Sequence, residues 1–267
     1  MRVISWNMGL NNRAFAKPGT HDQAWHYLLG LGPDIAFLQE CLPPSWVHGE
    51  GRLVGEAFSG WGSVIFCPRF PLRRSRPPEG SRIHALGAYL AMGEVSLPDG
   101  TDISAASVHA RASEATARQL GDVDPASIAR KSVPRPKVND LVFSQLQPLM
   151  LAPRRFIAAG DWNTGRTQSS AAAGIEFFER AGDAGWYDCV WDTFSREERT
   201  WFREGDTLVQ DDHVFCDPTL GGHVTAAWAA GDAALHLGLS DHAPLIVDFD
   251  VESVAMSNLR NDLEPPG

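Results

Sequence analysis

Six apolar runs in the sequence each end on a side chain that can bind a metal ion or move a proton. They are ISWN at 4–7, IAFLQE at 35–40, ASVH at 106–109, AAGDWN at 158–163, QDDHVF at 210–215 and LSDHAP at 239–244. Carboxylates and imidazoles act as general acids and bases, and carboxylate and amide oxygens bind hard cations. These residue types therefore favour a metal-assisted reaction at one shared site.

Each motif alone has a simpler structural explanation. A lone glutamate such as Glu40 is mostly a solvated acid, and a lone histidine such as His109 is mostly structural. Asp161 and Asn163 can form a turn by bonding their own backbone, and the SDH motif can cap a helix or a turn. Six such endings in one chain, however, are typical of strand ends that converge on a ligand site.

Strand geometry predicts how the GDWN motif is arranged. Residues two apart on a strand point to the same side. If the strand continues through Asn163, then Asp161 and Asn163 face one site while Trp162 points into the core. We expect Trp6 and Trp162 to be core residues rather than surfaces on which bases stack.

Oxygen is the only donor atom that the candidate cation ligands offer. They are Asn7, Glu40, Asp161, Asn163 and Asp241. Such ligands suit Mg²⁺, Mn²⁺ or Ca²⁺, whereas zinc normally recruits more histidine or cysteine. Mg²⁺ keeps several waters and binds through one or two carboxylates plus substrate phosphate. The sequence therefore predicts a hard divalent cation and a phosphate-ester substrate.

Many short strands with a few helices between them must position these residues. Strands are expected at 2–6, 34–39, 62–67, 88–97, 102–109, 155–160, 200–203, 213–216, 223–228 and 245–251. A capping box at Thr20 and Gln23 predicts a helix start, and apolar residues at helical spacing continue it to Leu31. Further helices are expected at 140–150 and 171–181. This order favours an α/β or α+β fold with at least one large sheet.

Three segments have a composition unlike that of a core element. Residues 73–78 are basic and marked by proline, which predicts a loop, and 111–137 are too rich in charge and proline to be expected as a core element. The segment 252–267 is polar and predicts a flexible C-terminal tail. No repeat or composition shift marks an internal boundary, so we expect one domain at 1–251, with 111–137 as a variable loop insertion.

Composition limits the class of protein and of partner. The 267 residues carry a net charge of −10, which argues against a broad basic surface on duplex phosphates. No apolar run reaches the ~18 residues of a membrane span, and no signal region begins the chain. The four cysteines are far apart and predict buried thiols. We expect a cytoplasmic monomer without membrane insertion.

The order SWN, LQE, SVH, GDWN, DHVF and SDH resembles the endonuclease/exonuclease/phosphatase superfamily, which has the DNase I-like fold. The resemblance runs from Arg2 to Val251 and includes TW at 200–201 and GSVIF at 62–66. It implies a four-layer αββα sandwich of two packed mixed β-sheets with outer helices. The chain differs from the usual pattern at Trp162, where phenylalanine is common, and at Gln210 and Asp211, where a basic and an apolar residue are common.

The resemblance implies catalytic roles for His109, Asp161, Asn163, Asp212 and His242, and metal ligation by Asn7, Glu40 and Asp241. His109 would contact the scissile phosphate, and Asp161 with Asn163 would handle the nucleophile and a phosphate oxygen. Asp212, preferred over Asp211 by its place in DHVF, would orient His242. Either His242 or Asp161 could take the proton from water. If Asp212 keeps His242 protonated, Asp161 is the better base.

The predicted function is a phosphoesterase, dependent on Mg²⁺ or Mn²⁺, that hydrolyses phosphodiester bonds of DNA or RNA. The alternative is a phosphatase acting on a nucleotide, an inositol phosphate or a phospholipid headgroup. An inactive binding protein of the same fold is disfavoured because Glu40 and the SDH pair are present, and a serine hydrolase because no GxSxG elbow exists. Candidate phosphate contacts, which could equally be solvated surface residues, are Arg73, Arg74, Arg76, Arg111, Arg130, Lys131, Arg135, Lys137 and Arg166.

Overall fold

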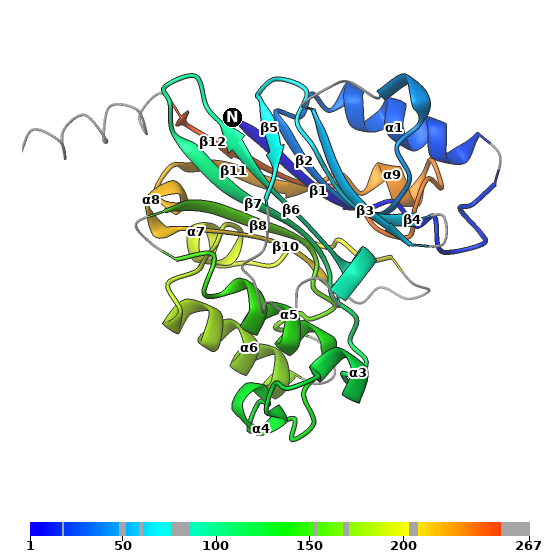
Figure 1. The fold of residues 1–267 in the computed structure, drawn as a ribbon. Helices are drawn as coiled ribbons and strands as arrows, with labels where there is room; N and C mark the ends of the chain where they lie inside the picture. The colour runs from blue at the N-terminus through cyan, green and yellow to red at the C-terminus, as the bar shows by residue number, and fades with distance from the viewer. Residues whose placement is uncertain are drawn as a thin grey trace, which may run out of the picture.

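The computed structural model describes residues 1–17, 19–47, 52–58, 61–75, 86–151, 154–167, 171–202 and 208–251 (Figure 1). The strands are β1 (Arg2–Asn7), β2 (Ile35–Cys41), β3 (Leu53–Phe58), β4 (Trp61–Phe66), β5 (Leu72–Arg74), β6 (Leu90–Ser96), β7 (Asp102–His109), β8 (Arg155–Asp161), β9 (Tyr187–Asp188), β10 (Asp212–Cys216), β11 (Val224–Ala229) and β12 (Leu245–Phe249). The α-helices are α1 (Thr20–Gly30), α3 (Ala117–Leu120), α4 (Pro125–Ile128), α5 (Val138–Leu146), α6 (Ala171–Asp183), α7 (Trp191–Phe194), α8 (Pro218–Gly221) and α9 (Asp232–Leu235). Two short 3-10 helices are η1 (Ser45–Val47) and η2 (Gly87–Tyr89).

The strands form two mixed six-stranded sheets. The first has the order β11-β12-β1-β2-β4-β3 and the second β5-β6-β7-β8-β10-β9. In each sheet one central pair is parallel, β1 with β2 and β7 with β8, and the other pairs are antiparallel. The sheets pack face to face with α1 and α9 outside one and α5 and α6 outside the other (Figure 1). The expected four-layer αββα sandwich is confirmed.

Alternation along the strands separates three apolar layers. Side chains such as Val3, Phe37 and Ile157 meet between the sheets. Ile4 packs outward in a cluster that also contains Trp25 of α1. Outward residues of the second sheet pack in a cluster with α5 and α6. Burial on both faces of each sheet explains why the strands read as nearly continuous apolar runs.

The same alternation places polar side chains at one end of the space between the sheets. On β1, β7 and β8 the last inward position is Asn7, His109 and Asp161, each four residues after an apolar inward residue. The register pairs His109 with Asp161 on parallel strands and Asp161 with Asp212 on antiparallel ones. Strand ends from both sheets therefore meet at one edge of the sandwich.

Most expected strands are present with shifted ends, and one is not. Residues 200–202 form no strand, and Trp201 makes an isolated bridge to His242; residue 203 lies outside the described residues. Three strands were missed, β3, β5 and β9. β5 overlaps the expected basic loop at residues 73–74. Its two arginines favoured a loop in the prediction, but the segment is an edge strand that pairs with β6.

Two helix expectations need correction. The capping box at Thr20 is wrong, because Gly19 with φ 84 is the N-cap, Thr20 already lies in the helix, and no side-chain cap bond forms. The view of 111–137 as too polar for a core element is also wrong in part. The segment contains α3 and α4, and it buries Ile128 and Arg130. Arg130 can be buried because its Nε lies 3.0 Å from Asp140.

Two expectations about composition can be checked. No helix in the described ranges is long and apolar enough to cross a membrane. The four cysteines are free and buried, as expected. The segment 252–267, expected to be a flexible tail, lies outside the described residues.

Gly160 lies where no side chain fits. A Cβ atom there would be 1.8 Å from the carbonyl oxygen of Val108 on β7. We predict that Gly160→Ala lowers the free energy of unfolding by at least ~2 kcal/mol, because the two central strands would have to separate. Chemical denaturation measures this. Gly182→Ala, which has open space in α6, should be neutral or stabilise by up to ~1 kcal/mol. Equal stability of the two variants would contradict the close approach.

Candidate active site

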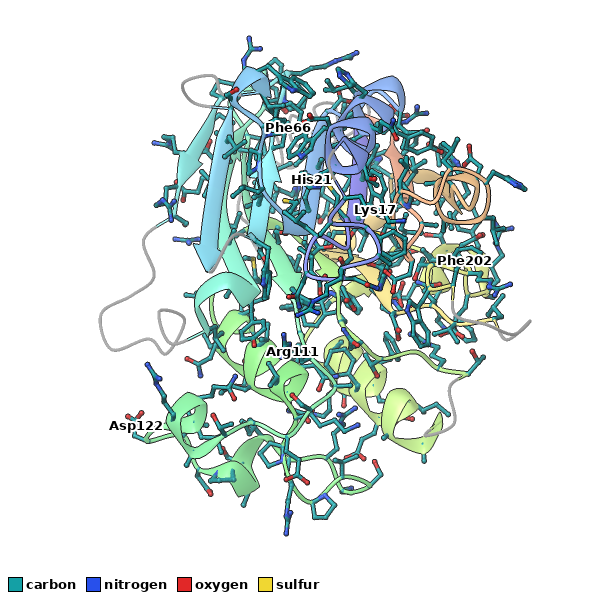
Figure 2. All side chains as sticks on the ribbon, turned by 90° about the vertical axis from the view of Figure 1, so that its right-hand side faces the viewer. Lys17, His21, Phe66, Arg111, Asp122 and Phe202 are labelled. Carbon is teal, nitrogen blue, oxygen red and sulfur yellow. The ribbon has the colours of Figure 1, made fainter. Side chains whose placement is uncertain are left out.

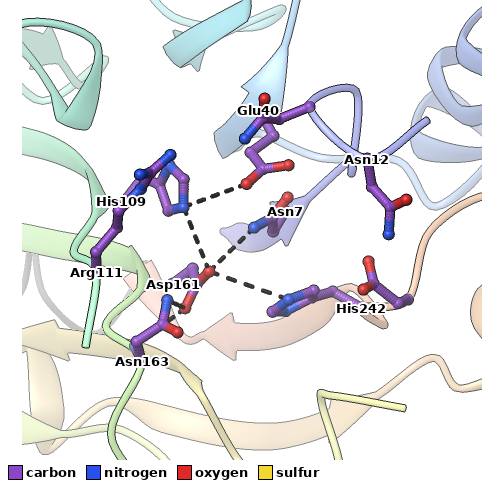
Figure 3. A pocket seen from close by; sticks show the side chains of 10 residues that line it. Asn7, Asn12, Glu40, His109, Arg111, Asp161, Asn163 and His242 are labelled. Carbon is purple, nitrogen blue, oxygen red and sulfur yellow. Dashed lines mark hydrogen bonds and ion pairs between the residues drawn. The ribbon is translucent and has the colours of Figure 1, made fainter. Parts of the chain in front are cut away.

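A pocket of about 290 Å³ opens at the edge where the strand ends meet (Figure 3). Its lining residues are Asn7, Asn11, Asn12, Glu40, His109, Arg111, Asp161, Asn163, Asp241 and His242. All the predicted catalytic and metal-binding residues except Asp212 therefore line one pocket. Asp212 is buried behind it and contacts His242.

Asp161 lies at the centre of the pocket and is almost fully buried. Its Oδ2 accepts a hydrogen bond from Asn7 Nδ2 at 3.0 Å, and its Oδ1 accepts one from Asn163 Nδ2 at 2.6 Å. His109 Nε2 and His242 Nε2 lie 3.8 and 4.0 Å from Oδ2 (Figure 3). Burial raises the pKa of Asp161 well above its ordinary value, with His242 acting against the rise.

Asn163 reaches Asp161 by a different route from the one expected. β8 ends at Asp161, and Asn163 has a left-handed φ of 48°. The Asn163 backbone N–H donates to Asp161 Oδ1 at 3.0 Å, which closes an Asx turn. The motif is therefore both a turn and part of the pocket. Trp162 is fully buried and packs against Phe177 and Phe215, as expected of a core residue.

A bulge at the end of β2 presents Glu40 to the pocket. The register with β4 shifts between Leu38 and Cys41, and Glu40 has a φ of 45°. Gln39 keeps the inward position, where its amide donates to Ser107 on the other sheet at 3.0 Å. Backbone strain of this kind in a non-glycine residue is found at functional sites. Burial raises the pKa of Glu40, and the nearby Asp241 adds to the rise.

His242 is held in one orientation by contacts on both its ring and its backbone. Nδ1 lies 2.8 Å from Asp212 Oδ2. Trp6 Nε1 donates to the His242 carbonyl at 2.9 Å, and the Ser240 hydroxyl accepts from the His242 N–H. Burial alone would lower the His242 pKa, but Asp212, Asp161 and Asp241 outweigh burial and raise it to about 10. The imidazole is therefore protonated at neutral pH.

Geometry decides between the two neighbouring aspartates. Asp212, the residue preferred from the sequence, makes the contact to His242. The Thr200 hydroxyl accepts hydrogen bonds from the backbone N–H groups of Asp211 and Asp212, which fixes the start of β10. Thr200 was part of the TW resemblance, and this contact gives it a structural role.

His109 is neutral at neutral pH, whereas His242 is protonated. Burial, followed by the nearby positive groups Arg111 and His242, lowers its pKa to about 3. Its Nε2 lies 3.4 Å from Glu40 Oε1. Nδ1 is buried, with no hydrogen-bond partner among the described residues. A neutral ring with its proton on Nε2 can donate to an oxygen in the pocket.

The donor set fits a hard divalent cation. No group of three or more His, Cys, Asp or Glu residues in the described part of the chain has metal-binding geometry. Mg²⁺ needs fewer protein ligands, since one or two carboxylates and several waters suffice. Glu40 and Asp241 both line the pocket, and their mutual repulsion contributes to the raised pKa of Glu40. A cation held by these carboxylates would offset that repulsion. Asn7 is less available, because its Oδ1 already accepts from the Gly9 N–H.

Of the candidate phosphate contacts, Arg111 alone lines the pocket among the described residues. Figure 2 shows it near the middle of the molecule, between the sheets and the green helices. Arg111, two residues after His109, was among the predicted phosphate contacts. Asn11 and Asn12 were missed, although they follow Asn7 closely, because nothing in their spacing marks them. The Asn11 backbone N–H bonds to Glu40.

The structure places the other arginines elsewhere. Arg73 pairs with Glu94 and Asp102, and Arg74 donates to the Gly55 carbonyl, both on the edge strand β5. Arg166 pairs with Asp188 at 2.9 Å and stacks on Phe178 and Trp191, so it stabilises the core rather than facing the pocket. Arg130 is buried. Lys131, Arg135 and Lys137 do not line the pocket, and Arg76 lies outside the described residues.

Comparison with solved structures identifies the architecture. The 3′-5′ exonuclease NExo from Neisseria meningitidis has a TM-score of 0.66 at 16% identity, covering 94% of this chain and 100% of that chain. An AP endonuclease from Archaeoglobus fulgidus has a TM-score of 0.64 at 14% identity, covering 94% and 100%. This chain has the DNase I-like fold. TDP2 from D. rerio, complexed with single-strand DNA product, also matches, with a TM-score of 0.60, 18% identity and coverage of 94% and 98%.

Similarity in sequence is much weaker than similarity in structure. No family model matches the chain, and no curated protein matches it significantly. At such low identity the DNase I-like neighbours show the fold, and the chemistry has to be argued from the pocket itself.

Replacing Asp212 tests the charge state of His242. Asp212→Asn removes the partner that raises the His242 pKa most, so we expect that pKa to fall from about 10 towards its ordinary value of 6.5. The ring would then lose its proton at a lower pH than in the wild type. NMR titration of the imidazole, without added metal, measures this. Asp211→Asn should lower the pKa much less, and equal shifts in the two variants would contradict the assignment.

Proposed function

We propose that the protein is a divalent-metal-dependent phosphoesterase that hydrolyses phosphodiester bonds of nucleic acid. One observation carries the proposal. Two carboxylates able to hold a cation, a protonated histidine, a neutral histidine and a buried carboxylate of raised pKa line one pocket. Hydrolysis of a phosphate ester needs these components, namely charge neutralisation on the phosphoryl oxygens, a base for water and help for the leaving oxygen.

Glu40 and Asp241 would hold the cation, with Asn7 beside them. The bound cation would supply positive charge to the phosphoryl oxygens and polarise the ester. Arg111 adds a second positive charge at the rim of the pocket. Placing the phosphate between these charges fixes its orientation before the reaction begins.

Two groups would divide the proton chemistry between them. His242, kept protonated by Asp212, would donate a hydrogen bond to a phosphoryl oxygen and stabilise the charge that develops there. A protonated imidazole cannot also accept a proton from water. Asp161 would take that role, because its raised pKa makes it a stronger base than an ordinary aspartate. Asn163 and Asn7 would hold its carboxylate in place.

Nucleic acid is the substrate class that the fold neighbours favour. NExo is described as a 3′-5′ exonuclease and the Archaeoglobus protein as an AP endonuclease. A phosphatase acting on a small phosphorylated molecule is the second candidate. It is favoured by the net charge of −10 and by Arg111 being the one lysine or arginine among the described residues that line the pocket. Assays on duplex and single-stranded DNA, RNA, nucleotides and inositol phosphates separate the two.

Substitutions in the pocket test the catalytic assignment. Glu40→Gln removes a cation ligand and His242→Ala removes the charge stabiliser. We expect each variant to lose roughly 10²- to 10⁴-fold in turnover. Oligonucleotide hydrolysis measures the loss, and circular dichroism checks folding. Glu179→Gln on α6 and His236→Ala, both at exposed positions, are matched controls and should retain activity. Normal turnover in a folded pocket variant would refute the assignment.

Chelation tests the cation requirement. We expect EDTA to abolish hydrolysis and added Mg²⁺ or Mn²⁺ to restore it, because Glu40 and Asp241 would otherwise repel the phosphate. The same titration in the Glu40→Gln variant should need more metal for half-maximal activity. Hydrolysis that persists in EDTA would exclude the metal-dependent mechanism.

A further inference from the structure

Two aromatic side chains and one arginine stand beside the pocket. The rings of Trp61 and Tyr89 lie 5.4 and 5.8 Å from the ring of His109, and 6.3 Å from each other. The guanidinium of Arg111 lies 5.5 Å from the centre of the Tyr89 ring. We call Trp61, Tyr89 and Arg111 the aromatic wall.

The fold fixes the aromatic wall to one side of the pocket. Trp61 begins β4, next to Gly62, which pairs with Cys41 just after Glu40. Tyr89 ends η2, immediately before Leu90, which pairs with Val108 just before His109. The aromatic wall thus joins the two sheets on the β4 and β6 side. His242 and Asp212 lie on the opposite side, near β12 and β10.

Packing alone does not account for the aromatic wall. His109 is buried, whereas Trp61 and Tyr89 each keep part of their surface exposed and Arg111 is exposed. The core tryptophans Trp6 and Trp162, by contrast, are fully buried. Exposed aromatic surface next to a phosphate pocket can take the face of a planar base, and an arginine adds cation–π attraction.

We propose that the aromatic wall binds an unpaired nucleobase next to the scissile phosphate, so that the substrate is single-stranded nucleic acid. The inference rests on the proposed function, because it takes the pocket to hold a phosphate ester. A base must leave its partner to lie on an aromatic surface. The net charge of −10 also favours a strand held by stacking at a few positions over a duplex held along its phosphates.

A purely structural role predicts a different outcome from base binding. If Trp61 and Tyr89 only brace His109, their loss should lower kcat equally for every phosphate ester. If they bind a base, their loss should act on KM, and only for substrates that carry a base at that position. The split between KM and kcat therefore distinguishes the two roles.

The experiment compares two single-stranded oligonucleotides that differ in one feature. One carries a base at every nucleotide, and the other carries abasic spacers on both sides of the cleaved phosphate. For Trp61→Leu and Tyr89→Leu we expect kcat/KM on the first to fall roughly tenfold through KM, with little change on the second. Trp191→Leu is the matched control, since Trp191 is a partly exposed aromatic beside Arg166, and it should behave as the wild type.

Further measurements separate failure of this inference from failure of the proposed function. Fluorescence anisotropy of labelled oligonucleotides with Mg²⁺ present, in the turnover-deficient His242→Ala background, reports binding with little turnover. The His242→Ala protein should bind the base-bearing strand more tightly than the spacer strand, a duplex or a mononucleotide, and adding Trp61→Leu should remove the first difference. Equal binding of the base-bearing and spacer strands, or equal loss of kcat on both, would overturn the inference while leaving a phosphoesterase. No hydrolysis of any phosphate ester would instead overturn the proposed function.

Discussion

The face-to-face packing of two sheets is the constraint on which the pocket depends. Every second residue of a central strand points into a space that both sheets enclose, so a polar side chain there loses its contact with water. Val3, Ala105 and Ile157 fill such positions within the core. Polar side chains take over the inward positions towards one end of the space, where Gln39 donates to Ser107 across the two sheets. Asn7, His109 and Asp161 are therefore brought together by the same alternation that builds the core.

The carboxylates gathered at this edge are buried and repel one another. The contacts around them offset only part of this destabilisation. Burial raises the pKa of Asp161 and of Glu40, so both carboxylates are destabilised as anions. The protonated His242 and the amides of Asn7 and Asn163 offset this for Asp161. For Glu40 the offset comes from His242, the Asn11 backbone N–H and Arg111, and a bound cation would add to it. The strain of the β2 bulge lies at the same residue.

The sequence predicted what depends on periodicity and on motif order. Alternation along the strands predicted that their ends converge. The αββα architecture was implied by the resemblance that the motif order carries, and Asp212 was chosen by its place in DHVF. What it could not predict depends on contacts made only in the folded chain. Asn163 reaches the pocket through a left-handed turn, Glu40 through a bulge, and the segment after His109 is ordered by the buried Arg130–Asp140 pair. Arg166 looked like a phosphate ligand because its sequence does not reveal Asp188.

The Asx turn at Asp161 limits which residues of the pocket could change to accept a different substrate. Its hydrogen bonds hold Asp161 Oδ1 at the end of β8, and Asn7 holds Oδ2, so the chain itself fixes both carboxylate oxygens before any ligand binds. Replacing Asp161 or Asn163 would therefore also disturb the end of β8. Differences in substrate would then be set by the residues around the pocket, such as Trp61, Tyr89 and Arg111, which take no part in the Asx turn.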